Sequence, residues 1–249
     1  MRIYAVAIIL ALAFAVEAAP LGTIDIEHIG YGAKSIIKVW GGGFSGVSIY
    51  GGVYMFETSN GTGKGGLLDD GQLGGFCIEL PQGAPGIPTT YDIVMPEEAQ
   101  KPPGFLIGTA KADYLAELWQ KFFDDSWAGG VPFSSQQNND AEAFAAAVWE
   151  IIYEDMPATP NDWDVTSGPG FRCTNADTGK ANDWLHSLDG GSKADLWAMV
   201  NTDKQDFLIK TPPGGVPEPA MIALLGLGGL VVRWRKKQTV INFRLQKGI

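Results

Sequence analysis

The two cysteines, Cys77 and Cys173, are the clearest candidates for side-chain chemistry in this chain. In an oxidising compartment, an even number of cysteines most often indicates a disulfide. A bridge between these two would close a loop of roughly 100 residues and would stabilise the fold by about 4–5 kcal/mol through the lost entropy of the unfolded chain. We therefore predict a disulfide between Cys77 and Cys173.

Other residue types that carry out chemistry give weaker signals. The two histidines, His28 and His186, have no neighbours at metal-ligand spacing, so we expect no zinc site and no serine–histidine–aspartate triad. Paired carboxylates can hydrolyse glycosidic bonds when a cleft brings them together. Such pairs occur at Asp69 with Asp70, Asp124 with Asp125, and Asp162 with Asp164. The stretch 161–164 lacks the EF-hand pattern, and the glycine runs match no phosphate-binding loop. We expect no catalytic residue, no metal and no cofactor.

The pattern of apolar residues predicts the elements that must position these side chains. Two apolar stripes at helical spacing predict long helices, with Thr109 as the cap of the first and Asn139 or Asp140 as the cap of the second. We expect helices at 109–125, 138–155 and 179–188, a polar loop at 59–75, and strands within 22–58, 76–80, 90–95, 163–174 and 196–210. The predicted fold class is α+β: an antiparallel β-rich domain with a two- to three-helix insertion, plus a C-terminal single transmembrane helix.

The N-terminal segment reads as a secretory signal peptide. Arg2 precedes an apolar run from Ile3 to Val16, and cleavage after Ala18 fits best because a later cut would place Pro20 directly after it. The whole chain has a net charge of −10, and the body is more acidic still because the terminal segments are rich in Lys and Arg. An acidic body would repel phosphates, so we expect no nucleic-acid partner.

The C-terminal segment has the order of a membrane anchor. A Pro- and Gly-rich linker at 211–219 ends in the motif Val216, Pro217, Glu218 and Pro219. An apolar run at 220–232 follows, shorter than the roughly 20 residues of a comfortable spanning helix. Basic residues come next and would stay in the cytoplasm: Arg233, Arg235, Lys236 and Lys237. The alternative is a buried C-terminal helix.

This tail resembles the PEP-CTERM sorting signal of Gram-negative bacteria, in which a Pro-Glu-Pro motif, an apolar run and a basic cluster occur in fixed order. The resemblance implies recognition by exosortase, a membrane transpeptidase-like enzyme, and an association with exopolysaccharide; some proteins labelled ice-binding carry the same tail. This chain departs from the pattern by continuing through 238–249. The resulting division is 1–18 signal peptide, 19–210 acidic extracytoplasmic α+β domain, 211–219 linker with motif, 220–237 membrane anchor and basic stop, and 238–249 cytoplasmic extension.

The body resembles secreted proteins related to thioester domains, through "FCIEL" at 76–80, "FAAAVWE" at 144–150 and a terminal "QDFLI" at 205–209. The resemblance implies that a cysteine like Cys77 forms an internal thioester with a glutamine in the helix, as in that family. The helix position holds Ala145, which has no amide, so we predict that this thioester does not form. Three states of Cys77 stay open: the favoured disulfide, a displaced thioester with Gln136 or Gln137, and an unreacted thiol.

These observations favour an exported, membrane-anchored and exosortase-processed surface or extracellular-matrix protein. We expect it to be non-enzymatic and associated with exopolysaccharide, with an exosortase, the membrane and polysaccharide as its partners. The alternatives are a covalent adhesin of the thioester type and a secreted carbohydrate-active enzyme that uses an Asp/Glu pair.

Overall fold

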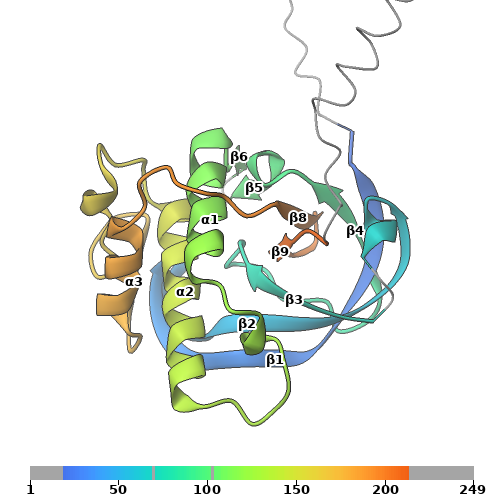
Figure 1. Ribbon diagram of the computed structural model, residues 1–249, viewed down its shortest axis with the longest axis horizontal. Coiled ribbons are helices and arrows are strands. Elements are labelled where there is room, and N and C mark those ends of the chain that lie inside the picture. The colour runs from blue at the N-terminus through green and yellow to red at the C-terminus, as the bar shows by residue number, and fades with distance from the viewer. Residues whose placement is uncertain (1–18, 69–70, 102–103, 213–249) are drawn as a thin grey trace, which may run out of the picture.

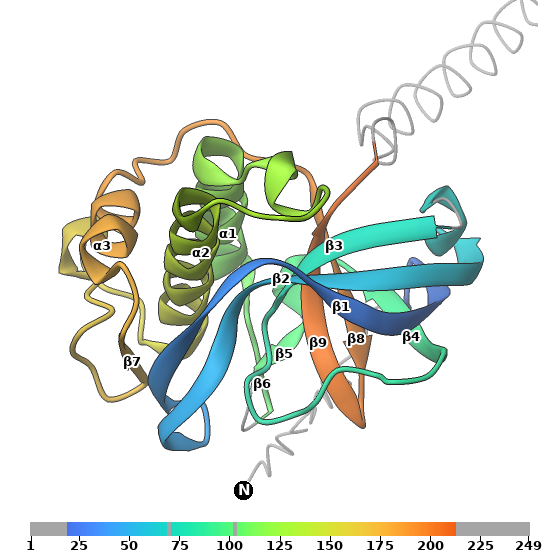
Figure 2. The same cartoon turned by 90° about the horizontal axis from the view of Figure 1, so that it is seen from below.

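The computed structural model describes residues 19–212 apart from 69–70 and 102–103. Within these limits most strands lie on one side of the molecule and the three helices on the other, whereas β7 lies beside α3 on the helical side (Figures 1 and 2). Every pair of neighbouring strands is antiparallel. The predicted α+β class with a helical insertion is therefore confirmed for the described body.

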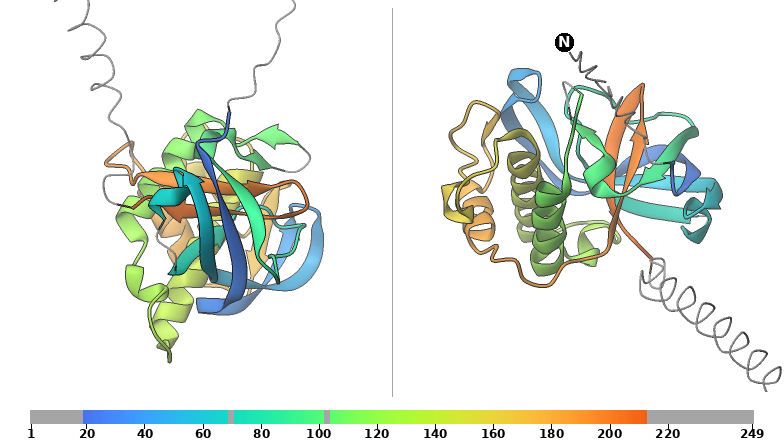
Figure 3. Two further views of the ribbon diagram at one scale, coloured as in Figure 1. Left: turned by 90° about the vertical axis from the view of Figure 1, so that its right-hand side faces the viewer. Right: turned by 90° about the horizontal axis from the view of Figure 1, so that it is seen from above.

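The main sheet contains seven strands in the order β2-β3-β9-β8-β4-β1-β7. Because β1 also pairs with β2, six of these strands close into a ring, and β7 extends it beside the second half of β1. Figure 3 shows the strands side by side, with the helices on one side of them. The strands are β1 (Gly22–Gly41), β2 (Phe44–Gly63), β3 (Gly71–Cys77), β4 (Thr89–Val94), β7 (Phe171–Thr174), β8 (Leu196–Asn201) and β9 (Lys204–Lys210), and a separate pair is formed by β5 (Gln100–Lys101) and β6 (Phe105–Leu106).

Strands β1 and β2 form a long hairpin of two 20-residue strands. The turn uses Gly42 and Gly43, whose φ angles of 53° and 89° lie in the region that glycine adopts without strain. The predicted polar loop at 59–75 is too long at both ends, because β2 continues to Gly63, where it pairs with the start of β1, and β3 begins at Gly71. Pairing satisfies the backbone of this polar segment, and a side-chain hydrogen bond of 2.7 Å joins Thr62 to Thr23 across the two strands.

The helices are α1 (Thr109–Phe122), α2 (Ser135–Tyr153) and α3 (Thr178–His186). Helix α2 begins earlier than predicted because Ser134 caps it, with Gln137 completing a capping box. Thr109 is the first residue of α1 and Gly108 takes the cap position, so the predicted cap is off by one residue.

Helix α2 is the centre of the body. Its residues from Ala141 to Ile152 are all buried, because the β1–β2 hairpin covers one side and α1 and α3 cover others. Alanines over much of this length let the neighbouring elements approach closely. At the middle of the helix, Phe144 is surrounded by the rings of Phe76, Trp119, Phe123 and Trp127, with centroids 4.7–6.1 Å from its own. This cluster ties β3 to the helices.

Several predictions concern the terminal segments, which lie outside the part of the chain that the structure describes. No helix in residues 19–212 is long and apolar enough to cross a membrane. The signal peptide, the sorting motif, the membrane anchor with its basic stop and the extension lie outside the described residues, at 1–18, 216–219, 220–237 and 238–249.

Candidate functional site: a buried cysteine–glutamine pair

Cys77 and Gln205 come together where β3 meets β9. Cys77 is the last residue of β3 and lies opposite Phe207 of β9. Side chains alternate along a strand, so Gln205 shares the face of Phe207 and is the diagonal neighbour of Cys77. The amide nitrogen Nε2 of Gln205 lies 2.9 Å from Sγ of Cys77. That separation is typical of hydrogen bonds to the smaller oxygen atom, so the contact is close for sulfur.

The Gln205 residue is held at both its main chain and its side chain. Its Nε2 also donates to the carbonyl oxygen of Glu79 at 3.1 Å. Its main-chain carbonyl accepts a 3.0 Å hydrogen bond from the hydroxyl of Tyr91, and its main-chain N–H donates to Gly83. Cys77 and Gln205 are 2% and 5% exposed. The pair is therefore both fixed in position and shielded from bulk water.

Two tyrosines from the β1–β2 hairpin complete the polar surroundings. Tyr54 and Tyr31 line the same pocket as Cys77 and Gln205. The rings of the two tyrosines have centroids 4.9 Å apart, and Tyr54 is buried whereas Tyr31 is half-buried. Burial raises the pKa of the Tyr54 hydroxyl well above its usual value, so the group keeps its proton at neutral pH.

Helix α2 fixes the chain around Cys77 from the other side. The indole Nε1 of Trp149 donates a 2.8 Å hydrogen bond to the carbonyl of Cys77. The main-chain N–H of Leu80 donates to the hydroxyl of Tyr153, one turn further along the helix, also at 2.8 Å. The segment that leaves β3 is thus attached to the helix directly after the thiol.

The pair lines a pocket of about 260 Å³. Its walls are mainly aromatic and apolar, and Tyr50, which is 39% exposed, connects the lining to the surface. Cys77 and Gln205 are joined in the lining by Tyr31, Phe44, Ile49, Tyr50, Tyr54, Leu80, Gln82, Gly83, Ala84 and Trp149. A small nucleophile could reach the pair through such a pocket while most water is kept away.

The electrostatics of the site keep the thiol neutral. Burial raises the pKa of the Cys77 thiol to about 12, and the carboxyl groups of Glu79 and Asp206 add to the effect. Burial also raises the pKa of Asp206 to about 8. A free thiolate at this position is therefore unfavourable, and a sulfur leaving an acyl group here needs a proton.

The structure differs from the predicted disulfide, because Cys77 and Cys173 are both free and buried. Cys173 lies on β7 opposite Val39, and its pKa is raised to about 12 by burial, with contributions from Glu150 and Glu142 of α2. Cys77 instead meets α2 at Trp149. The two thiols lie on β3 and β7, which are not neighbouring strands of the sheet, and this separation is not visible in the sequence.

The helix residues considered for a thioester lie elsewhere. Ala145 is 1% exposed and packs toward Gly51 of β2. Gln136 donates to Asp140, and Gln137 is used in the cap of α2. The residue that sequence reasoning missed is Gln205, the first residue of the segment "QDFLI" at 205–209. Its signal is a polar residue at an inward-facing strand position, in phase with the buried Phe207 and Ile209.

The paired carboxylates have structural partners where they are described. Asp124 accepts from the main chain of Ser126, and Asp125 pairs with Lys210 at the surface. Burial opposes the ionisation of Asp164. Hydrogen bonds from Thr166, Ser167 and Asn182 outweigh this effect and lower the pKa of Asp164 to about 2. Asp162 caps a short turn at Thr159, and Asp69 and Asp70 lie outside the described residues. Within residues 19–212, no group of His, Cys, Asp and Glu side chains could hold a metal ion.

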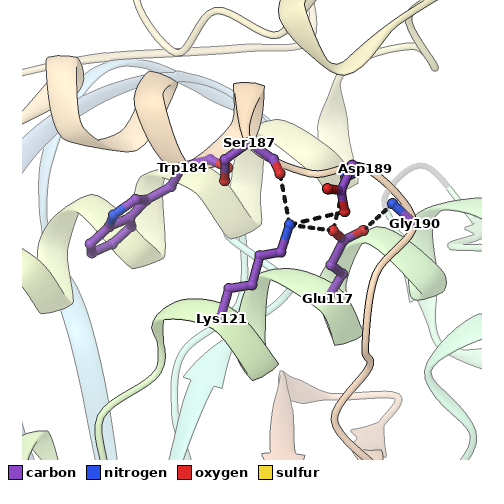
Figure 4. A network of polar contacts seen from close by, with 6 residues as sticks. All are labelled: Glu117, Lys121, Trp184, Ser187, Asp189 and Gly190. Carbon is purple, nitrogen blue, oxygen red and sulfur yellow. Dashed lines mark hydrogen bonds and ion pairs between the residues drawn. The ribbon is translucent and has the colours of Figure 1, made fainter.

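A second polar network, centred on Glu117, has a structural role (Figure 4). The carboxylate of Glu117 is 1% exposed and accepts hydrogen bonds from the main-chain N–H groups of Asp189 and Gly190, at 2.8 and 2.9 Å. The ammonium of Lys121 lies 2.8 Å from it and also donates to the carbonyl of Ser187. These contacts fasten α1 to the loop that follows α3.

Comparison with known proteins matches residues 215–237 to the PEP-CTERM protein-sorting motif. No curated protein and no solved structure matches the chain. The resemblance of the body to thioester-domain proteins therefore gains no support from these comparisons. The matched segment coincides with the predicted tail, and a sorting motif of this kind implies export, membrane anchoring before processing, and processing by an exosortase into an extracellular or surface protein.

Proposed function

We propose that the body of this exported protein forms an internal thioester between Cys77 and Gln205 and uses it to attach itself covalently to a partner outside the cell. The observation that carries the proposal is the 2.9 Å contact between Sγ of Cys77 and the amide of Gln205 in a buried, mainly aromatic pocket. Cysteine and glutamine are the two side chains that can condense to a thioester. The sorting motif brings the protein to the surface, where such a bond meets acceptors.

The bond forms by acyl transfer within the chain. Sγ of Cys77 attacks the side-chain carbonyl carbon of Gln205, a C–S bond forms, the C–N bond breaks, and the nitrogen leaves as ammonia with the proton of the thiol. An amine or hydroxyl of a partner then attacks the same carbon. The C–S bond breaks, the thiol regains a proton, and an amide or ester joins Gln205 to the partner.

The surroundings suit a reactive bond that must survive until it meets its partner. Burial of both residues slows attack by water, and the aromatic walls exclude bulk solvent. Each molecule reacts once, which fits the expectation of a non-enzymatic protein. The predicted association with exopolysaccharide belongs to this proposal, since sugar hydroxyls are acceptors that an acyl group can esterify.

Intact mass tests the proposal directly. The exported wild-type protein should be one ammonia lighter than its processed sequence, whereas Cys77→Ala and Gln205→Ala should each have the full mass. Gln82→Ala is the matched control, because Gln82 lines the same pocket and its Nε2 hydrogen-bonds to Glu79 instead. Methylamine should add to the wild type at Gln205 and release one thiol. A wild type of full mass that ignores methylamine would overturn the proposal.

A further inference from the structure

An exposed strip of basic and aromatic side chains crosses the far half of the β1–β2 hairpin and the neighbouring strand β7. Side chains alternate along β1, so the even-numbered residues from 34 to 40 share one face, while the buried Ile37 and Val39 point to the other. Residues directly opposite each other in an antiparallel pair also share a face. Tyr50 of β2 lies opposite Ile36. Arg172 of β7 lies opposite Trp40. This basic–aromatic strip consists of Lys34, Ile36, Lys38, Trp40, Tyr50 and Arg172.

Each cation of the strip lies near an aromatic ring. Nζ of Lys34 is 3.7 Å from the centroid of the Tyr50 ring. Nζ of Lys38 and the guanidinium carbon of Arg172 are 5.3 and 5.1 Å from the centroid of the Trp40 ring. Cation–π attraction at such distances holds long, flexible side chains in place. The strip therefore presents positive charge and ring surface together.

The positive charge of the strip is not neutralised by the protein itself. Among the described residues, no carboxylate forms an ion pair with Lys34, Lys38 or Arg172. The chain has 28 acidic residues and a net charge of −10, yet residues 28–56 contain neither Asp nor Glu. The strip is thus a confined positive region on an acidic body, and it complements an anionic partner.

We propose that the basic–aromatic strip is a non-covalent binding site for an acidic polysaccharide, a chain of sugars that carry carboxylates. Lys38 and Arg172 donate hydrogen bonds to the carboxylates, and the C–H faces of the sugar rings pack on the aromatic and apolar side chains. Tyr50 and Ile36, which are 39% and 57% exposed, supply that surface at one end. Trp40 is four residues further along β1, or roughly 14 Å away, so the strip accommodates several sugar units.

The surrounding charge favours a thin chain over a broad anionic surface. Electrostatic repulsion acts over about 8 Å at physiological ionic strength. A bilayer or a nucleic-acid duplex would bring its phosphates near the acidic groups outside the strip, whereas a single polymer chain can follow the strip alone. An acidic peptide would supply the charge, but it would lack the sugar rings that match the aromatic side chains.

The strip reaches the pocket described above but does not depend on its chemistry. Tyr50 belongs to the strip and also lines the pocket of Cys77 and Gln205. A polysaccharide bound on the strip therefore lies at the mouth of this pocket. None of the cations that bind it takes part in the proposed thioester, so the two proposals can fail separately.

Affinity electrophoresis of the full-length exported protein in a neutral detergent tests the proposal, with polygalacturonate in the gel and EDTA to remove bridging metal ions. The double variant Lys38→Gln/Arg172→Gln should bind about 4–25-fold more weakly, since each exposed charge pair contributes roughly two- to fivefold. Lys193→Gln/Lys210→Gln is the matched control, because it removes two equal charges from lysines paired with carboxylates elsewhere on the body. It should bind as the wild type does.

A second set of measurements identifies the kind of partner. Trp40→Leu removes a ring but no charge, so it should weaken binding of polygalacturonate and leave the weaker binding of polyglutamate unchanged. Neutral dextran should not retard the wild type. Equal binding of polyglutamate and polygalacturonate, stronger binding to phosphatidylglycerol vesicles, or equal losses in the two double variants would each overturn the proposal.

Cys77→Ala separates this site from the thioester. It should bind polygalacturonate as the wild type does, and a loss of binding in Cys77→Ala would show that retention is covalent and would overturn the non-covalent site. A wild type without ammonia loss that still binds polygalacturonate would overturn the thioester and support the strip.

Discussion

The indole nitrogen of Trp149 donates a 2.8 Å hydrogen bond to the carbonyl oxygen of Cys77, so the central helix holds the strand end that carries the thiol. Trp149→Phe should leave this buried carbonyl without a donor and should lower the free energy of unfolding by about 1–3 kcal/mol. Urea unfolding measures the change. Trp163→Phe is the control, because Trp163 is equally buried but its Nε1 has no hydrogen-bond partner in the described part of the chain. Equal losses in both variants would show that the ring volume matters and the hydrogen bond does not.

Thiol counting distinguishes the three states considered for Cys77. After unfolding without reductant, the wild type should show one titratable thiol, that of Cys173, and two after methylamine treatment. Gln205→Ala should show two from the start, because its Cys77 has no acyl partner. Reduction should change none of these counts. A wild-type protein with no titratable thiol before reduction and two after reduction would instead support the disulfide between Cys77 and Cys173.

The Glu117 network should stabilise the protein in a pH-dependent way. Burial opposes ionisation of Glu117, but Lys121 and the main-chain N–H groups of Asp189 and Gly190 outweigh it and lower the pKa to about 2. A lowered acid pKa gives stability that is present above the usual pKa of about 4.3 and is lost as pH falls toward 2.

Glu117→Gln should therefore cost about 1.5–3 kcal/mol at neutral pH, as expected for buried hydrogen bonds to a charged group, and the cost should shrink in acid. The difference in unfolding free energy between the variant and the wild type is measured by thermal or urea unfolding between pH 7 and 2. Asp113→Asn, which breaks an exposed ion pair of 2.8 Å with Lys193, should cost at most about 1 kcal/mol. A cost for Glu117→Gln that is the same at both ends of the pH range would contradict the assigned charge.

Glu150 should make the protein less stable as the pH rises, which is the opposite of the pH dependence expected from Glu117. It is 1% exposed, its Oε2 has no hydrogen-bond partner in the described residues, and burial raises its pKa to about 8. A raised acid pKa gives stability that is complete below the usual pKa of about 4.3 and is lost as pH rises to 8. Glu150→Gln stays neutral, so its unfolding free energy should fall less between pH 5 and 8 than that of the wild type. Parallel pH curves for the two proteins would refute this account.

The sorting motif gives a prediction about location. Glu218→Ala changes the Pro-Glu-Pro core of the matched segment, so the full-length form should accumulate in the membrane fraction and less body should be released. Immunoblots of membrane and medium fractions compare the variant with the wild type. Glu97→Ala, a substitution in the body far from the motif, should be processed normally. Equal release of all three proteins would argue against recognition of this residue.

Local patterns predicted most of the elements but not the site. The apolar stripes within 109–125 and 138–155 predicted both long helices, which the structure has at Thr109–Phe122 and Ser135–Tyr153, because helical spacing is a property of neighbouring residues. The extension of β2 to Gly63 was missed, because polar residues there form a strand only through pairing with Gly22 and Thr23. Strand register between residues far apart in the chain leaves no local trace.

The same limit explains the outcome for Cys77. Its contact with Gln205 depends on the register of β3 against β9, which joins residues separated by 128 positions. Residue type alone favours Cys173 as the partner, but Cys173 lies on β7, which is not a neighbour of β3 in the sheet, and both cysteines are free. The resemblance to thioester-domain proteins pointed to a helix position, which holds Ala145, whereas the glutamine that contacts Cys77 is Gln205 on β9.

The position of Gln205 on the last strand has a mechanical consequence. Strand β9 ends at Lys210, and the linker and sorting motif follow within the next nine residues. An acceptor joined to the Gln205 side chain would pull on the tail through the main chain from residue 205 onward. Before processing, while the tail anchors the protein, tension between the partner and the membrane would then bypass the remainder of the body, from β1 to β8. The tether would hold under load even if those strands and helices were pulled out of register, so its strength would be set by covalent bonds and not by the resistance of the fold.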